Sequence, residues 1–154
     1  MVAKMISKIL VPVDGSNHAE RAVDFASSLA DEYGAEMILL NVMSHAGSSQ
    51  VPEELKQFAE LEHVRVTEAD VLKSAASEIV NNAYQRAVDI GVKKIERDLA
   101  VGDPAETIVD YAKENKVDVV VMGRRGLGRI GGLLMGSVSS KVAQLADCTC
   151  VTVK

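Results

Sequence analysis

Residues 117–137 read VDVVVMGRRGLGRIGGLLMGS, and this stretch decides the class of fold. Val117 to Met122 is apolar apart from Asp118, which predicts a short strand buried on both faces. Glycines dominate the following segment, and apolar residues then recur at helical spacing. Those residues are Val138, Val142 and Leu145. A buried strand, a glycine-rich connection and a helix form one unit of an α/β sheet.

The same alternation extends toward the N-terminus. Ile6 to Val13 is an almost unbroken apolar run, which predicts another strand buried on both faces. Pro12 fits only near the end of that strand, because proline cannot donate to a ladder of hydrogen bonds. A helix capped by Ser16 or Asn17 should follow, and Gly34 should end it.

Strands and helices also alternate toward the C-terminus. Glu36 to Val42 predicts a buried strand, and the half-charged pattern of Lys94 to Val101 is typical of an edge strand. Asp103 has the character of a helix cap, and Thr149 to Val153 predicts the last strand. This alternation indicates a parallel sheet covered by helices on both faces, within a single domain over residues 1–154.

One long region is less regular. Pro52 to Gly91 is charged and predicts helix, most clearly in its second half. The apolar face expected there consists of Leu72, Ala76, Ile79, Ala83, Ala87 and Ile90. The earlier stretch, 53–68, is more polar, and the sequence leaves its role open.

The composition argues against several classes of protein. Hydrophobic residues make up 47% of the 154 residues and aromatic residues 3%, so the core must be aliphatic. A net charge of -5 disfavours a nucleic-acid partner. No signal peptide is apparent, and no stretch approaches the roughly 20 apolar residues of a membrane span. Cys148 and Cys150 have the spacing of neither a redox motif nor a zinc site. We therefore expect a cytoplasmic protein with no membrane or nucleic-acid partner.

The glycine-rich stretch after Met122 has the chemistry of an anion site. Glycines allow sharp bends and expose main-chain N–H groups. The helix behind the stretch, with Ser137 as its expected cap, adds the positive end of its dipole. Arg124, Arg125 and Arg129 add positive charge, so phosphate is the expected anion. The alternative is a surface loop without a ligand, which explains neither the glycine density nor the helix behind it.

Two familiar phosphate motifs do not fit this stretch. Gly126 to Gly131 matches G-x-G-x-x-G, but it lies near the C-terminus and not in the first strand–helix unit of the sheet. Gly131 to Ser137 resembles a P-loop, but Ser137 stands where that motif needs lysine. The three histidines are scattered, so we expect no histidine metal site and no catalytic histidine.

A longer motif fits better. Gly123, Gly126, Gly136 and Ser137 match the G-x2-G-x9-G-[ST] signature of the universal stress protein family. The opening KILVPVDGS and the closing ADCTCVTV also resemble that family, so the likeness covers nearly the whole chain. The chain is therefore similar to the nucleotide-binding branch of the family.

The resemblance implies a set of binding residues. Asp14, beside Pro12 and Val13, would meet the adenine and ribose, and Val42 would pack on the adenine. The main chain after the fourth strand would wrap the ribose and phosphates, through Met122, Gly123, Arg124, Arg125, Gly126, Leu127, Gly128 and Arg129. The start of the last helix would hold the phosphates, through Gly136, Ser137, Val138 and Ser139. This arrangement agrees with the chemistry, because a carboxylate accepts hydrogen bonds from a ribose or amino group but repels phosphate.

The resemblance also implies an architecture. We expect a doubly wound, Rossmann-like sheet of five parallel strands in the order 3-2-1-4-5. The last strand would lie on an open edge, and an apolar edge is normally covered, so we expect a homodimer through that strand. Arg124 and Arg125 depart from the smaller residues that family members often carry, which adds charge but narrows the pocket.

The expected function is binding of ATP or AMP in a stress-response or regulatory role. Mg²⁺ or Mn²⁺ could accompany the nucleotide through its phosphates. No lysine clamp or general base is evident, so we expect no enzyme, or at most slow hydrolysis. Two alternatives stay open: a slow ATPase, and an interaction module that dimerises without nucleotide. The sequence does not distinguish ATP from AMP as the cellular ligand.

Overall fold

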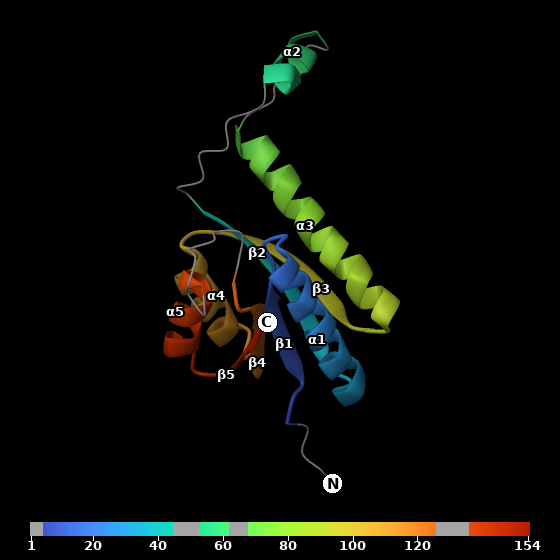
Figure 1. Ribbon diagram of the computed structural model, residues 1–154, viewed down its shortest axis with the longest axis vertical. Coiled ribbons are helices and arrows are strands. Elements are labelled where there is room, and N and C mark those ends of the chain that lie inside the picture. The colour runs from blue at the N-terminus through green and yellow to red at the C-terminus, as the bar shows by residue number, and fades with distance from the viewer. Residues whose placement is uncertain (1–4, 45–52, 62–67, 126–135) are drawn as a thin grey trace.

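A computed structural model describes residues 5–44, 53–61, 68–125 and 136–154. Within these residues, five parallel strands form one sheet in the order β3-β2-β1-β4-β5 (Figure 1). The strands are β1 (Lys8–Pro12), β2 (Glu36–Met43), β3 (Ile95–Val101), β4 (Val119–Gly123) and β5 (Thr149–Val153). The predicted order is therefore confirmed, with β3 and β5 at the two edges.

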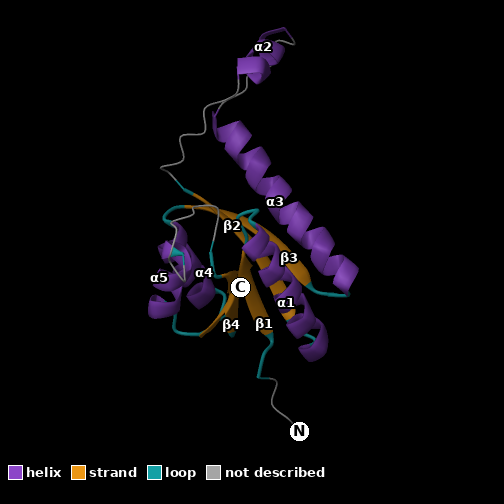
Figure 2. Cartoon of the chain, viewed as in Figure 1, coloured by secondary structure: helices purple, strands orange, loops and turns teal. Residues whose placement is uncertain are grey.

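Helices cover both faces of the sheet (Figure 2). Helices α1 (Asn17–Tyr33) and α3 (Glu68–Ile90) pack on one face, and α4 (Pro104–Glu114) and α5 (Ser137–Leu145) pack on the other. Helix α2 (Glu53–Leu61) lies apart from the sheet, beyond the start of α3 (Figure 1). Among the residues described, no helix has both the length and the apolar character needed to cross a bilayer.

Each face of the sheet has its own aliphatic core, because successive side chains of a strand point to opposite faces. In β2, Met37 and Leu39 join the core under α1 and α3. Ile38 and Leu40 join the core under α4 and α5. All four side chains are at most 1% exposed. This burial on both faces is the physical reason for the continuous apolar runs in the sequence.

Helix α1 begins and ends where the sequence predicts. The hydroxyl oxygen of Ser16 accepts a hydrogen bond from the N–H of Ala19 at 3.2 Å, so Ser16 is the N-cap. At the other end, the N–H of Gly34 bonds the carbonyl oxygen of Ala30. Each cap satisfies a main-chain group that the helix alone would leave without a partner.

The charged region from residue 52 to residue 91 differs from the prediction. It contains two helices, α2 and α3, and residues 62–67 between them lie outside the described part of the chain. The buried face of α3 consists of Ala76, Val80, Ala83 and Ala87. Ile90, expected on that face, is 39% exposed. Ile79, which was expected there, is half-buried and packs against the same core, and Val80 beside it is buried.

Pro12 ends β1 without breaking a ladder of hydrogen bonds. Strand β1 pairs with β4 at Ile9 and Leu10, whereas its pairing with β2 continues to Pro12, opposite Leu40. The N–H of Val13 donates to the carbonyl oxygen of Leu40 at 2.8 Å. The nitrogen of Pro12, one residue earlier, therefore points toward β4, beyond the last paired residue. Strands β1 and β4 separate here, at the edge where a doubly wound sheet binds its ligands.

Candidate functional site

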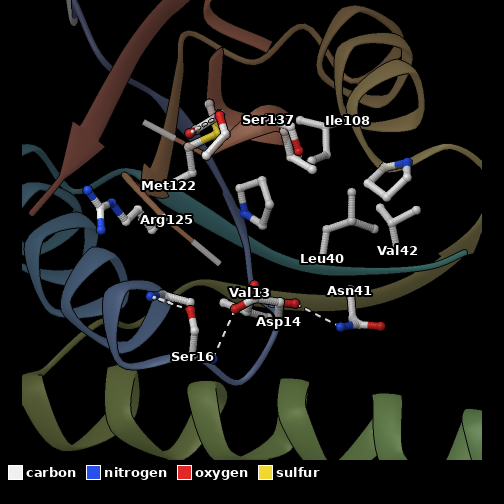
Figure 3. A pocket seen from close by; sticks show the side chains of 17 residues that line it. Val13, Asp14, Ser16, Leu40, Asn41, Val42, Ile108, Met122, Arg125 and Ser137 are labelled. Atoms are coloured by element: carbon white, nitrogen blue, oxygen red, sulfur yellow. Dashed lines mark hydrogen bonds between the residues drawn. The ribbon is translucent and has the colours of Figure 1, made fainter. Parts of the chain in front are cut away.

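A cavity of about 320 Å³ opens beyond the carboxyl ends of β1, β2 and β4 (Figure 3). Helices α1, α4 and α5 complete its walls. It is lined by Pro12, Val13, Asp14, Ser16, Ala19, Leu40, Asn41, Val42, Pro104, Ile108, Met122, Gly123, Arg125, Gly136, Ser137, Val138 and Ser139. The order of the strands reverses at β1, so the cavity occupies the crevice expected for this fold.

One wall of the cavity is apolar. Leu40 and Val42 come from the end of β2, Ile108 from α4, Met122 from β4 and Val138 from α5. Figure 3 shows Leu40, Val42 and Ile108 around the same space. A wall of this kind accommodates a flat, weakly polar group, while the polar groups elsewhere in the cavity fix its orientation.

A carboxylate stands at the turn between β1 and α1. The Oδ1 atom of Asp14 accepts a hydrogen bond from the main-chain N–H of Ser16 at 2.9 Å. Ser16 in turn caps α1, so the two side chains together fix the path of the turn (Figure 3). Asp14 is thereby held at the edge of the cavity.

A buried amide fixes the residue before Asp14. The side chain of Asn41 is 7% exposed, and its Nδ2 donates to the carbonyl oxygen of Val13 at 2.8 Å. The N–H of Val13 meanwhile donates to the carbonyl oxygen of Leu40, also at 2.8 Å. Val13 is thus held through both its N–H and its C=O group.

Helix α5 begins across the cavity from Asp14 (Figure 3). Its N-cap is Gly136, with φ -70 and ψ 161, and its first residue is Ser137. The prediction that Ser137 caps this helix is therefore wrong. The extended main chain of Gly136 occupies the cap position, and no side chain there accepts a capping bond. The first turn of α5, which includes Val138 and Ser139, lines the cavity and brings the positive end of the helix dipole to it.

Strand β4 and helix α1 make a close contact at Gly123. A Cβ atom on this residue would lie 2.7 Å from the carbonyl carbon of His18 and 2.9 Å from the nitrogen of Ala19. Both neighbours are main-chain atoms, which cannot move aside cheaply. Gly123 is therefore required for packing, in addition to its place in the glycine motif.

Arg124 and Arg125 have different positions. Arg125 lines the cavity, whereas Arg124 does not. The N–H of Arg124 donates to the carbonyl oxygen of Val153 at 2.7 Å, and its own carbonyl oxygen accepts from the N–H of Gly136 at 2.7 Å. The main chain of Arg124 therefore connects the end of β5 to the start of α5.

The structure brings most of the predicted site residues together. The cavity lining includes Pro12, Val13, Asp14, Val42, Met122, Gly123, Arg125, Gly136, Ser137, Val138 and Ser139. Arg124 lies beside the cavity without lining it. The remaining four predicted residues, Gly126, Leu127, Gly128 and Arg129, lie outside the described part of the chain.

Other lining residues were not predicted. They are Ser16, Ala19, Leu40, Asn41, Pro104 and Ile108. Asn41 carries a usable signal, because it is the one polar residue in the apolar run from Met37 to Val42. Pro104 and Ile108 follow the turn after β3, which lies at the same edge of the sheet as the other loops of the site.

Comparison with known proteins gives consistent similarities. The model of the universal stress protein family matches residues 5–154. The universal stress protein YxiE of Bacillus subtilis is 34% identical over 158 residues, covering 97% of this chain and all of that protein. A crystal structure of a universal stress protein in complex with cAMP is similar with a TM-score of 0.71 and 27% identity, over 97% of this chain and 98% of that one.

A second solved structure extends the comparison. The universal stress protein from Archaeoglobus fulgidus in complex with dAMP is similar with a TM-score of 0.66 and 25% identity. The similarity covers 97% of this chain and 99% of that one. The cAMP-bound and dAMP-bound proteins are thus similar to this chain in overall fold.

Proposed function

The chain belongs to the universal stress protein family, and we propose that it binds an adenine nucleotide in the cavity beyond β1 and β4. Relatives that share its architecture bind cAMP and dAMP, which both contain adenine and a phosphate. The observation that carries the proposal is a single cavity that combines an apolar wall, formed in part by Leu40 and Val42, with the start of α5. A base requires the first and a phosphate the second.

The base would lie against Val42, which also offers main-chain groups. The carbonyl oxygen of the next residue, Met43, accepts from Gly102 on the β3 side at 2.9 Å. Peptide groups alternate between the two sides of a strand, so the N–H and C=O of Val42 point toward β1. Strand β1 has ended opposite Leu40, so these groups face the cavity. A donor beside an acceptor matches the N1 and 6-amino groups of adenine.

The sugar and phosphates would extend from Asp14 toward α5. The Asp14 carboxylate accepts hydrogen bonds and suits a ribose hydroxyl or the amino group of the base. The first-turn N–H groups of α5 and the side chain of Arg125 suit phosphate oxygens. This polarity fixes the orientation of the nucleotide, because phosphates beside Asp14 would be repelled.

Binding is proposed without rapid turnover. Ser137 occupies the position at which a P-loop carries its lysine, so the usual clamp on the outer phosphates is missing. In the described residues, no group of three or more His, Cys, Asp or Glu side chains could hold a metal ion. Mg²⁺ or Mn²⁺ would therefore be held through the phosphates of ATP.

The test is titration calorimetry with ATP and AMP, together with mass spectrometry of the ligand that co-purifies with the protein. We expect heat and thermal stabilisation by both nucleotides. Absence of both effects for both ligands overturns the proposal. Turnover of ATP well above background, lost in Asp14→Ala, would show a slow ATPase instead.

The two arginines provide a matched pair of variants. Arg125→Ala removes a charge from the cavity lining, and we expect it to weaken ATP about tenfold, the effect of one charge-assisted hydrogen bond. Arg124→Ala leaves the lining unchanged and should keep the affinity within about twofold. Equal losses in both variants would show a general charge effect and not a contact with the phosphates.

We place the protein in a regulatory, stress-response role in the cytoplasm. Slow or absent turnover suits a protein that changes its interactions when a nucleotide is bound. Fractionation of the cell of origin, followed by detection of the chain, would test the location.

We also propose a homodimer through β5. In the described part of the sheet, β5 pairs with β4 and lies at the edge. Val153 bonds the main chain of Arg124 on the β4 side, so the N–H of Thr152 points to the open side. Thr152→Pro would remove that donor and keep the bonds to β4. Light scattering should report a dimer for the parent chain and a monomer for this variant; a monomeric parent would contradict the proposal.

A further inference from the structure

Asn41 occupies a position in the sheet where a main-chain bond is expected. In the parallel pairing of β1 with β2, the N–H of Glu36 donates to the carbonyl oxygen of Ser7 at 2.9 Å. The same register, continued to the end of β1, directs the N–H of Val42 at the carbonyl oxygen of Val13. In the structure, that oxygen is bonded by Nδ2 of Asn41 at 2.8 Å (Figure 3).

We propose that Asn41 is a positioning residue for base recognition: its side-chain amide takes the main-chain bond at the end of β1 and thereby leaves the peptide of Val42 to the ligand. The inference rests on the proposed function, and it adds a residue that does not itself touch the base. Asn41 is 7% exposed and has a fixed hydrogen bond, so its amide is well ordered for this task.

The consequence for the ligand follows from hydrogen-bond chemistry. The N–H and C=O of Val42 form a donor beside an acceptor, which pairs with N1 and the 6-amino group of adenine. Hypoxanthine has an N1–H donor and a 6-oxo acceptor, which is the reverse order. Without the amide of Asn41, the N–H of Val42 can close onto Val13 and extend the ladder by one bond. The cavity would then lose the N–H group that pairs with N1 of adenine.

The test measures the affinities for AMP and for inosine monophosphate by calorimetry. In the parent chain we expect AMP to bind at least about tenfold more tightly, since inosine monophosphate mismatches both hydrogen bonds and a single mismatch already costs roughly that factor. In Asn41→Leu, which keeps the branched shape and removes the donor, AMP should weaken about tenfold and inosine monophosphate should change little. The ratio of the two affinities should therefore approach one.

The histidine variant controls for the hydrogen bond. Nδ1 of an imidazole lies near the position of Nδ2 of asparagine and can donate to the same oxygen. Asn41→His should therefore keep the ratio of affinities within about threefold of the parent. If Asn41→Leu does not fold, Asn41→Ser, whose hydroxyl is too short to reach Val13, makes the same test.

The outcomes separate the two proposals. A parent chain that binds neither nucleotide overturns the proposed function itself. A parent that prefers AMP, with a leucine variant that keeps the same preference, overturns the role of Asn41. A uniform loss of both ligands in the variant also overturns it, because this result indicates a structural role alone. Circular dichroism of each variant confirms that the fold is intact before titration.

Discussion

The hydroxyl group of Ser139 donates to the main-chain carbonyl oxygen of Arg124 at 2.8 Å. The N–H of Gly136 reaches the same oxygen at 2.7 Å, and the Ser139 hydroxyl also lies 3.1 Å from the carbonyl oxygen of Gly136. These bonds join the two described ends of the glycine-rich segment. A serine has one O–H donor, so a phosphate would have to compete with two carbonyl oxygens for it.

Ser139→Ala should therefore weaken the connection between the two described ends of the glycine-rich segment. It should not remove a contact with phosphate. Ser139 is 4% exposed, and its loss leaves the Arg124 oxygen with one partner fewer, so we expect the free energy of unfolding to fall by about 1 kcal/mol. Urea denaturation of the ligand-free protein measures this change. Ser140→Ala, a less buried neighbour on the same helix, is the control. An unchanged stability in Ser139→Ala would contradict the structural role.

Two glycines of the motif should respond differently to alanine. At Gly123 a Cβ would press on the main chain of His18, so Gly123→Ala should lower the free energy of unfolding by about 1–3 kcal/mol, as overpacking does. At Gly136 the nearest atoms to a Cβ are 3.5 Å away, so Gly136→Ala should keep the fold and affect chiefly the ligand. Thermal unfolding and AMP titration of the pair separate the two effects. Equal destabilisation by both substitutions would be inconsistent with the geometry.

The hydrogen bond that Asp14 accepts from Ser16 and the negative charge of its carboxylate can be tested separately. Asp14→Asn keeps an oxygen for the N–H of Ser16 and removes the negative charge. We expect adenosine, which carries no phosphate, to bind about fivefold more weakly, because the acceptor is no longer ionised. The melting temperature should stay close to that of the parent. Asp14→Ala should lower both the affinity for adenosine and the stability of the fold. An Asp14→Asn variant with the parental affinity would show that the charge of Asp14 does not contribute to binding.

Asp118 gives the fold a dependence on acid pH. Its Oδ2 accepts three hydrogen bonds at 2.9 Å, from the N–H and hydroxyl of Ser7 and from the N–H of Lys8. The bond from the Ser7 main chain is the largest of the causes that hold the pKa of Asp118 below its usual range. A carboxyl with a lowered folded-state pKa stabilises the fold above its unfolded pKa, about 4, and this contribution is lost as the pH falls through the folded pKa.

Asp118→Asn should therefore flatten the loss of stability below about pH 4. At neutral pH the substitution should cost no more than about 1 kcal/mol, because water around this half-exposed group screens the interaction. Denaturation curves from pH 2 to pH 7 test both expectations. Asp110→Asn, on the exposed side of α4, is the control. An Asp118→Asn variant with the same pH profile as the parent would show that Asp118 does not cause the loss of stability in acid.

Much of the fold is readable from the sequence because its signals are local. The alternation of apolar runs with capped helices predicts the parallel sheet, and Ser16, Gly34 and Asp103 all cap or end helices as expected. The strand order follows from the family resemblance and is confirmed. The cap of α5 is displaced by one residue, to Gly136, because the choice between neighbours depends on the backbone angles that the tertiary structure imposes.

Features of the site that depend on distant segments are harder to read. The bond from Asn41 to Val13 requires the register between two strands, which the sequence does not specify. Gly123 was expected only to expose its main chain, but its contact with His18 depends on how closely α1 crosses β4. In both cases the residue type was visible in the sequence, whereas its partner was not.

The peptide groups of Arg124 have a consequence for the molecule as a whole. The N–H of Arg124 bonds Val153 of the edge strand β5, and its C=O bonds Gly136, the cap of α5. The end of β5 and the start of α5 are therefore linked through two hydrogen bonds and the main chain of a single residue. If a nucleotide in the cavity changes how tightly β5 binds a neighbouring molecule, thermodynamic reciprocity requires that neighbour to change the affinity for the nucleotide by the same factor.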